Sequence, residues 1–196
     1  MTKFDTLIKR FFDIYFSFFC IVITLPIVLI CWIVASFETK SNGLFFHTRV
    51  GLHGREFKVI KIKTMHNNDQ INTITSINDK RLTISGKFFR KFKLDELPQF
   101  INIILGNMSF VGPRPDVIKY YNMTTDDQKI IYTVRPGLTG PASLKYKDEE
   151  VVLAKVDDPL SYNDDVIWPD KVNININYIK DYNIFNDIYI IIRTVL

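Results

Sequence analysis

Two adjacent carboxylates, Asp95 and Glu96, lie in the stretch KLDELPQF, directly after a cationic run and just before Pro98. One interpretation is structural: a carboxylate at a helix start caps free N–H groups, and a second one complements the helix dipole. The other is chemical: one carboxylate acts as a nucleophile and its neighbour helps to bind a metal. The two are compatible, because N–H groups at a helix start also favour phosphate binding.

The two parts of the chain differ in charge. Residues 1–115 hold 16 Lys/Arg against 8 Asp/Glu, a net +8, whereas residues 116–196 hold 9 against 13, a net −4. A basic part suits an anionic partner such as nucleic acid, anionic lipid or a phosphorylated substrate. Charge alone does not choose among these, and an ordinary solvated surface explains it equally well.

Several cations are candidates for binding phosphate. Arg114 lies between Pro113 and Pro115, which restrict its backbone, and its planar fork suits phosphate oxygens. The alternative is a surface arginine in a turn. The other candidates, each of which could instead be a solvated charge, are Lys61, Lys63 and Arg90.

The cysteines and histidines argue against a soft metal site. Cys20 and Cys31 lie in one apolar run, which excludes a disulfide framework and disfavours structural zinc. The three histidines, His47, His53 and His66, do not have metal-ligand spacing. Any bound metal is therefore expected to have oxygen ligands, as Mg²⁺ does.

An uncharged segment of 24 residues, Ile14 to Phe37, is long enough to cross the hydrocarbon core of a membrane. Pro26, near its midpoint, predicts a kink. Either a kinked helix spans the bilayer, or the chain turns near Thr24 and returns to the same face. Basic residues at both ends favour the second course, while broken backbone at membrane depth needs polar partners, of which Thr24 is the only local one.

Lys9 and Arg10 lie where the chain enters this segment. They could bind a lipid phosphate or the phosphate of a lipid substrate, or they could be ordinary interfacial anchors. Asp13 is expected to pair with a cation within the fold.

The rest of the chain predicts one domain with short elements. Turn signals and alternation indicate a hairpin over residues 44–65, followed by a polar loop over 66–80. Helices are expected at about 96–105, ended by Gly106, and at about 116–131. Residues 172–179 fit strand or helix, and the stretch 184–196 is apolar enough to pack on the core or on a membrane surface.

Six motifs, in order, resemble the bacterial sugar transferases, or monotopic phosphoglycosyl transferases, of the minimal single-domain type. They are KRFFD (9–13), the proline-broken apolar segment, RVG (49–51), FKVIKIKTM (57–65), KLDELPQFINIILGNMSFVGPRP (93–115) and RPGLTG (135–140). The resemblance implies an α+β, mainly helical fold with a re-entrant membrane helix hairpin broken at Pro26, interfacial amphipathic helices and a small β-hairpin. It also implies an anchor at 1–40 packed as one unit with a catalytic domain at 41–196, on the cytoplasmic face of the bacterial inner membrane.

The reaction implied by the resemblance transfers a sugar-phosphate from a UDP-sugar to a polyprenyl phosphate such as undecaprenyl phosphate. The products are a polyprenyl-diphospho-sugar and UMP, in the first membrane step of glycoconjugate synthesis. By the same analogy Asp95 attacks the β-phosphate and forms a covalent intermediate, and Glu96, with Asp95, holds Mg²⁺. The chain departs from the family at His47 and Ser143, where the family often has Gln, and at Leu25, where it commonly has Ser.

Two other classes of protein also fit parts of the sequence. A non-catalytic membrane adaptor could use the basic part to dock anionic lipid or a pathway partner. A nucleic-acid binder has little support, because the sequence holds no recognised motif for it. Membrane lipid is an expected partner in the leading interpretation, and a homodimer is compatible with it.

Overall fold

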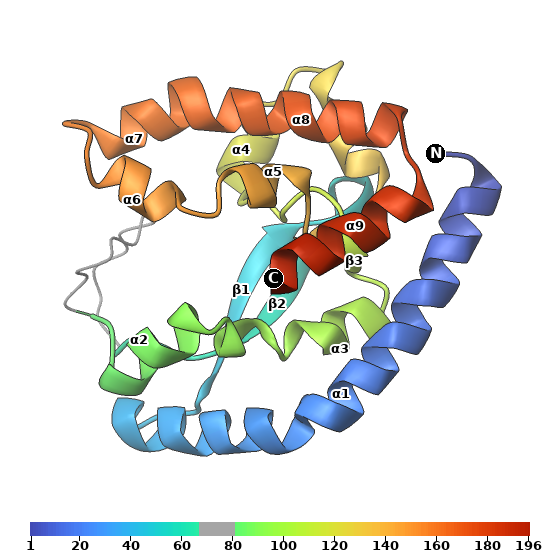
Figure 1. Cartoon of the computed structure of the whole chain (residues 1–196). Coiled ribbons are helices and arrows are strands. Elements are labelled where there is room, and N and C mark those ends of the chain that lie inside the picture. Colours follow the sequence, from blue (N-terminus) through green and yellow to red (C-terminus); the bar gives the residue numbers. More distant parts are fainter. Residues whose placement is uncertain (67–80) are drawn as a thin grey trace.

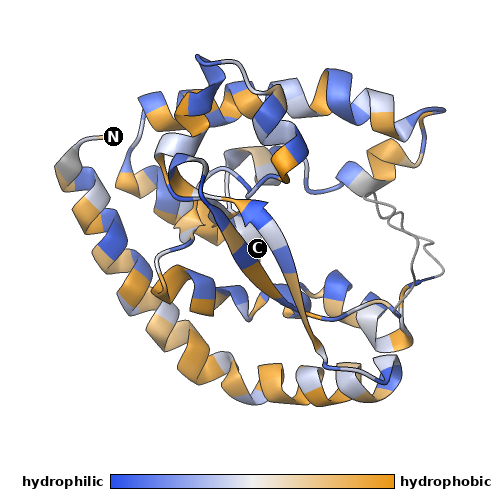
Figure 2. Ribbon diagram, turned by 180° about the vertical axis from the view of Figure 1, so that it is seen from behind, coloured by the Kyte–Doolittle hydropathy of each residue, from blue (hydrophilic) through white to orange (hydrophobic). Residues whose placement is uncertain are grey.

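The structure is a computed structural model that describes residues 1–66 and 81–196. Its largest element is the helix α1 (Lys3–Thr39), which runs along one edge of the molecule (Figure 1). The predicted polar loop lies, except for His66, outside the described residues. Among the described elements, α1 alone is long and apolar enough to cross a membrane. Figure 2 shows how densely apolar residues follow one another along it.

Helix α1 bends but is not interrupted. Pro26 lies inside it, although proline removes the N–H that would pair with the carbonyl of Val22. Thr24 Oγ1 donates to the carbonyl of Cys20 at 2.7 Å, a contact that also bends helices. The bend is visible in Figure 1. The expected helix hairpin is therefore one bent helix, and the Thr24 hydroxyl binds the carbonyl of Cys20 rather than the Val22 carbonyl that Pro26 leaves without its N–H.

The predicted β-hairpin is present. Strands β1 (Leu44–Val50) and β2 (Glu56–Ile62) are antiparallel and are joined by the short turn η1 (Leu52–Gly54). The register places Phe45 opposite Lys61, His47 opposite Val59 and Arg49 opposite Phe57. Since side chains alternate along a strand, these six share one face of the hairpin.

A second pair of strands, β3 (Ser109–Val111) and β4 (Gly137–Thr139), is parallel. Their backbones approach closely where they meet: a Cβ on Gly137 would lie 2.2 Å from the nitrogen of Gly112. Only glycine fits such an approach. This contact holds the turn that contains Arg114 against the turn that follows Arg135.

The remaining described elements are short helices and turns. They are α2 (Ile84–Lys91), η2 (Leu94–Glu96), α3 (Gln99–Ile104), α4 (Ile118–Met123), η3 (Gln128–Thr133), α5 (Pro141–Lys145), α6 (Glu149–Leu153), α7 (Pro159–Tyr162), the π-helical η4 (Asn163–Ile167), α8 (Trp168–Lys180) and α9 (Ile184–Val195). The helix expected at 116–131 is instead two elements, α4 and η3, because the chain is extended at Thr124. The ambiguous stretch 172–179 is helical and forms part of α8.

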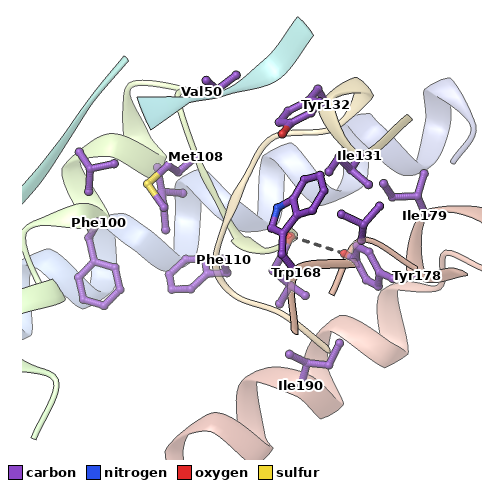
Figure 3. Close-up of a cluster of buried hydrophobic side chains, with 14 residues drawn as sticks. Val50, Phe100, Met108, Phe110, Ile131, Tyr132, Trp168, Tyr178, Ile179 and Ile190 are labelled. Carbon is purple, nitrogen blue, oxygen red and sulfur yellow. Dashed lines mark hydrogen bonds between the residues drawn. The ribbon is translucent and has the colours of Figure 1, made fainter. Parts of the chain in front are cut away.

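Two apolar clusters hold α1 against the body of the protein. The larger one includes Phe100, Phe110, Trp168 and Tyr178 (Figure 3). From α1, the Phe16 ring lies 4.9 Å from that of Phe110. The smaller cluster joins the C-terminal half of α1 to β2 and α2 through Cys31, Ala35, Ile62 and Phe89. Fully burying a large apolar side chain stabilises the fold by roughly 1.5–3 kcal/mol. The two clusters therefore hold both halves of α1 against the body of the protein.

Polar contacts fix the start of α1. Lys9 forms a buried ion pair with Asp187 of α9. Arg10 donates to the carbonyls of Ile103 at 2.6 Å and Ile104 at 2.8 Å, at the end of α3. Asp13 accepts from the Ser109 hydroxyl and the Phe110 N–H at 3.0 Å each. Asp13 is thus structural, as expected, but its hydrogen bonds go to neutral groups of β3.

The other end of α1 is also attached to the body. The carboxylate of Glu38 accepts from the hydroxyl and the N–H of Ser85, in the first turn of α2. The contacts at Lys9, Arg10 and Glu38 therefore tie both ends of α1 to the same folded unit.

Candidate active site

The turn η2 carries Asp95 and Glu96. Helix α2 ends just before Lys93, which has φ = 55° and redirects the chain into η2. The following helix α3 begins at Gln99, with Pro98 in the cap position. The predicted helix at 96–105 thus starts later than expected. Because a proline occupies the cap position, the capping role considered for Asp95 is wrong.

Glu96 is held by two cations. Its Oε1 accepts from Lys61 Nζ at 2.7 Å and from Arg114 Nη2 at 2.9 Å, and its side chain is 13% exposed. Burial by itself would raise the pKa of Glu96, but Arg114 and Lys61 reverse this and hold the pKa well below its usual range. Glu96 in turn raises the pKa of Arg114. Glu96 is therefore ionised and fixed in orientation.

Asp95 has a different environment. It is 7% exposed, and in the part of the chain that the structure describes, its Oδ1 has no hydrogen-bond partner. Burial and the adjacent Glu96 raise its pKa, while Lys61, Arg90 and Lys93 act against this. A buried acceptor without a partner costs roughly 1–3 kcal/mol. A buried polar atom without a partner in a native structure needs an explanation, and a catalytic role or a bound ion is one such explanation.

The predicted cations divide into two groups. Lys61 and Arg114 contact Glu96, and Arg90, at the end of α2, stabilises the charge of Asp95 while its Nε donates to Thr64 Oγ1 at 3.0 Å. Lys63 instead reaches the junction of α1 and β1, where its Nζ donates to Ser41 Oγ at 2.8 Å. The structure thus gathers Lys61, Arg90 and Arg114 around the carboxylates.

Lys9 and Arg10 are used elsewhere in the fold. Lys9 is buried on Asp187, and Arg10 is bound to the two carbonyls at the end of α3. If a buried lysine left its partner, the carboxylate would remain buried without a compensating charge, which is strongly destabilising. The contacts of both residues join α1 to the body, and their binding of a phosphate stays a prediction.

Two polar residues next to this cluster, Arg49 and Asp116, were not among the predicted site residues, and a third, His47, was noted as a departure from the family rather than as a site residue. Arg49 Nη1 donates to the carbonyl of Pro115 at 3.3 Å, and its Nη2 lies 3.3 Å from His47 Nδ1. Asp116, directly after the Arg114 turn, accepts from the Tyr132 hydroxyl at 3.0 Å, and burial raises its pKa to about 6. The hairpin register alone would have placed His47 and Arg49 on the Lys61 face.

The donor set around Asp95 fits Mg²⁺. Residues 1–66 and 81–196 hold no group of three Asp, Glu, His or Cys side chains that could enclose an ion. Mg²⁺ is commonly bound by one or two carboxylates together with substrate phosphates and water, rather than by an all-protein cage. The Oδ1 of Asp95, which has no hydrogen-bond partner in the described part of the chain, lies next to an ionised Glu96 and suits that kind of site.

The long apolar helix and the carboxylate–cation cluster on η2 are accompanied by a clear relationship in sequence. The chain belongs to the bacterial sugar transferase family, whose model matches residues 4–196. It is 32% identical over 97% of its length to the UDP-glucose:undecaprenyl-phosphate glucose-1-phosphate transferase of Escherichia coli, and it spans 40% of that protein.

Two further relatives differ in length. The chain is 30% identical to a Bacillus subtilis protein named uncharacterized sugar transferase EpsL, with 96% of this chain and 86% of that protein covered. It is 31% identical to the undecaprenyl-phosphate galactose phosphotransferase of Salmonella typhimurium, with 95% of this chain and 39% of that protein covered. The chain therefore corresponds to less than half of the longer relatives.

Proposed function

We propose that this protein transfers a sugar-phosphate from a UDP-sugar to a polyprenyl phosphate, and so starts the synthesis of a polysaccharide or other glycoconjugate. The observation that carries the proposal is the buried Asp95 oxygen, which has no hydrogen-bond partner among the described residues, beside a Glu96 held by Lys61 and Arg114. The names of the relatives in Escherichia coli and Salmonella typhimurium support the choice of substrates.

The proposed reaction has two steps. A carboxylate oxygen of Asp95 attacks the β-phosphorus of the UDP-sugar, the bond to the bridging oxygen breaks, and UMP leaves with that oxygen. An oxygen of the polyprenyl phosphate then attacks the same phosphorus, and the bond to Asp95 breaks. The product is a polyprenyl-diphospho-sugar, and the free carboxylate of Asp95 is restored.

The surrounding residues have separate roles in this proposal. Lys61 and Arg114 keep Glu96 ionised, and Arg114, whose side chain is 53% exposed, is accessible to the phosphates of the donor. Arg90 favours the charged form of Asp95. Asp95 and Glu96 would hold Mg²⁺, which when bound neutralises charge on the phosphate oxygens.

We also propose that α1 enters the membrane and returns to the same face, so that residues 1–40 and 41–196 form one unit on the cytoplasmic side of the inner membrane. Support comes from the attachment of both ends of α1 to one body, through Lys9 at the start and Glu38 at the end. A helix that crossed the bilayer would separate those two ends by the membrane thickness.

Short amphipathic helices supply further apolar surface for an interfacial position. Ile84 and Phe88 of α2 are exposed, as are Phe185, Tyr189 and Ile192 of α9. An exposed apolar face of this kind lies favourably at the boundary between headgroups and acyl chains. This supports membrane lipid as a partner along α2 and α9 as well as α1.

The test uses the purified protein in nanodiscs with Mg²⁺, undecaprenyl phosphate and a panel of UDP-sugars, with UMP release as the readout. One sugar should give turnover, and Asp95→Asn should lower it by about 10³-fold or more, because it removes the nucleophile. Asp126→Asn, at an exposed carboxylate, is the matched control. Turnover that survives in Asp95→Asn would exclude the two-step route, and the absence of turnover with every donor would favour the adaptor.

A further inference from the structure

His47 lies on the hairpin face that also carries Arg49 and Lys61. Its Nδ1 is 3.3 Å from Arg49 Nη2. A guanidinium has N–H donors and no acceptor, so Nδ1 must accept this hydrogen bond and the ring proton must lie on Nε2. The contact therefore selects one neutral tautomer of His47.

The polar contacts continue from Arg49 to the catalytic carboxylates. Arg49 Nη1 donates to the carbonyl of Pro115 at 3.3 Å, and the preceding residue, Arg114, donates to Glu96 Oε1 at 2.9 Å. Glu96 Oε1 also accepts from Lys61, at 2.7 Å, which brings the series back to the hairpin. A displacement of Arg49 would thus move the turn that presents Arg114.

The charges around His47 favour a neutral acceptor at this position. Burial, Arg49 and Lys61 lower the pKa of His47 to about 4, so it is neutral at pH 7. Burial and Arg114 lower the pKa of Arg49 to about 10, and at pH 7 it remains charged. An uncharged acceptor stabilises the Arg49 guanidinium here, whereas an additional cation would repel it.

We propose that His47 is a positioning residue for the phosphates of the nucleotide-sugar. By accepting from Arg49 it holds the Pro113–Pro115 turn, and so fixes Arg114 relative to Glu96 and to the diphosphate of the donor. The ligand in this statement rests on the proposed function, whereas the contact between His47 and Arg49 does not. A glutamine would serve in the same way through its side-chain oxygen, and an aliphatic residue would not.

The kinetic test compares His47→Gln with His47→Leu in nanodiscs. The leucine variant should raise the KM for the UDP-sugar by about 10-fold with kcat within about threefold, because phosphate positioning is lost while the nucleophile stays in place. The glutamine variant should stay within about threefold of the wild type. His53→Asn, at an exposed histidine in the η1 turn, is the control. Equal activity of the leucine variant and the wild type, or equal losses in both variants, would overturn the proposal.

A double-mutant cycle tests whether His47 acts through Arg49. In an Arg49→Gln background, His47→Leu should add less than about a twofold further rise in KM, since its partner is already gone. Independent, additive losses would contradict the proposed relay.

An activity-independent measurement separates this proposal from the proposed function. Nitrogen NMR of histidine-labelled protein in nanodiscs, assigned with His47→Gln, should show a neutral His47 with its proton on Nε2 at pH 7. Arg49→Gln should release that tautomer preference. A proton on Nδ1, or a charged ring, would overturn the proposal even if the enzyme is active. Should no donor be turned over, the expected spectrum would still support the contact and the fault would lie with the proposed function.

Discussion

At the residue scale, the adjacent carboxylates Asp95 and Glu96 differ in the direction of their pKa shifts and in their hydrogen-bond partners. Glu96 accepts from two cations, which outweigh its burial and keep it ionised, whereas Asp95 has a raised pKa and an oxygen without a partner in the described chain. Environments that separate the pKa values of neighbouring groups usually mark different roles in a site. Here they suit Glu96 to a fixed charge and Asp95 to a reacting group.

The first prediction concerns Lys61. Lys61→Met keeps most of the side-chain volume but removes one of the two cations on Glu96 and a charge that favours ionised Asp95. We expect kcat/KM for the donor to fall by about 100-fold, with a change in Tm of only a few degrees. Lys58→Met, at an exposed position on the other face of β2, should leave kcat/KM unchanged. Equal effects of the two substitutions would refute the role of Lys61.

The second prediction concerns Asp116, whose pKa is raised by burial to about 6. A carboxyl with a raised folded-state pKa stabilises the fold below its unfolded pKa of about 4, and this contribution is lost as the pH rises through about 6. Asparagine cannot lose a proton, and its side-chain oxygen can still accept from Tyr132. The Tm of Asp116→Asn minus that of the wild type should therefore increase between pH 4.5 and pH 7.5. Thermal melts in detergent that show a constant or falling difference would contradict this.

At the element scale, the site depends on how short segments are joined. The turn η2 meets the hairpin through Lys61 and meets the turn before α4 through Arg114. That turn is held in place by the close approach of Gly112 and Gly137 between β3 and β4. The proline and glycine motifs thus position Arg114, which lies within one of them, relative to Glu96.

The third prediction tests the close backbone contact between Gly112 and Gly137. An alanine at Gly137 would place its Cβ 2.2 Å from the Gly112 nitrogen and 2.3 Å from the Thr139 carbonyl oxygen, both of them backbone atoms that cannot move separately. We expect Gly137→Ala to lower the Tm by about 10 °C, which corresponds to roughly 3 kcal/mol in a domain of this size. Thr133→Ala, at an exposed position in η3, should change the Tm by no more than about 2 °C. A Tm of Gly137→Ala equal to that of the wild type would contradict the prediction, because it would mean that β3 and β4 can move apart without loss of stability.

At the scale of the whole molecule, α1 is part of the folded body rather than an anchor attached by a linker. Its N-terminal half contributes to the main core, and its C-terminal half packs on Ile62 and Phe89. Because the same body holds both ends, inserting α1 across a bilayer would require breaking the buried pair of Lys9 with Asp187 or the contact of Glu38 with Ser85. The free-energy cost of breaking such contacts favours a re-entrant course.

The fourth prediction follows from that course. In a background without Cys20 and Cys31, single cysteines at Thr2 and Asn42, both exposed, should be labelled by a membrane-impermeant maleimide from the same side of oriented vesicles. Cysteines introduced on opposite sides of a known spanning helix serve as the control. Labelling of the two positions from opposite sides would mean that α1 crosses the membrane.

Local patterns in the sequence were enough to predict the hairpin, the apolar segment, the bend near Pro26 and the Asp95–Glu96 pair. They also indicated Lys61, Lys63, Arg90 and Arg114 as candidates for binding phosphate, and the structure brings all of these except Lys63 to the carboxylates. Periodicity, turn residues and composition act over a few neighbouring residues, so they carry this information directly. Helix boundaries were less accurate, because tertiary contacts decide where α3 begins and where α4 ends.

Only the tertiary structure decided which partner each polar group has. Lys9 and Arg10 have the residue types of a phosphate site but are bound within the fold. His47, Arg49 and Asp116 lie next to the cluster although none of them was predicted as a site residue. These contacts link residues 9 with 187, 49 with 115 and 61 with 96, so they depend on strand register and on the packing of distant elements. The sequence by itself thus determined the family and singled out the Asp95–Glu96 pair. The three-dimensional packing determined which cations lie at the two carboxylates and which hold α1 in place, because charge pairing follows proximity in space.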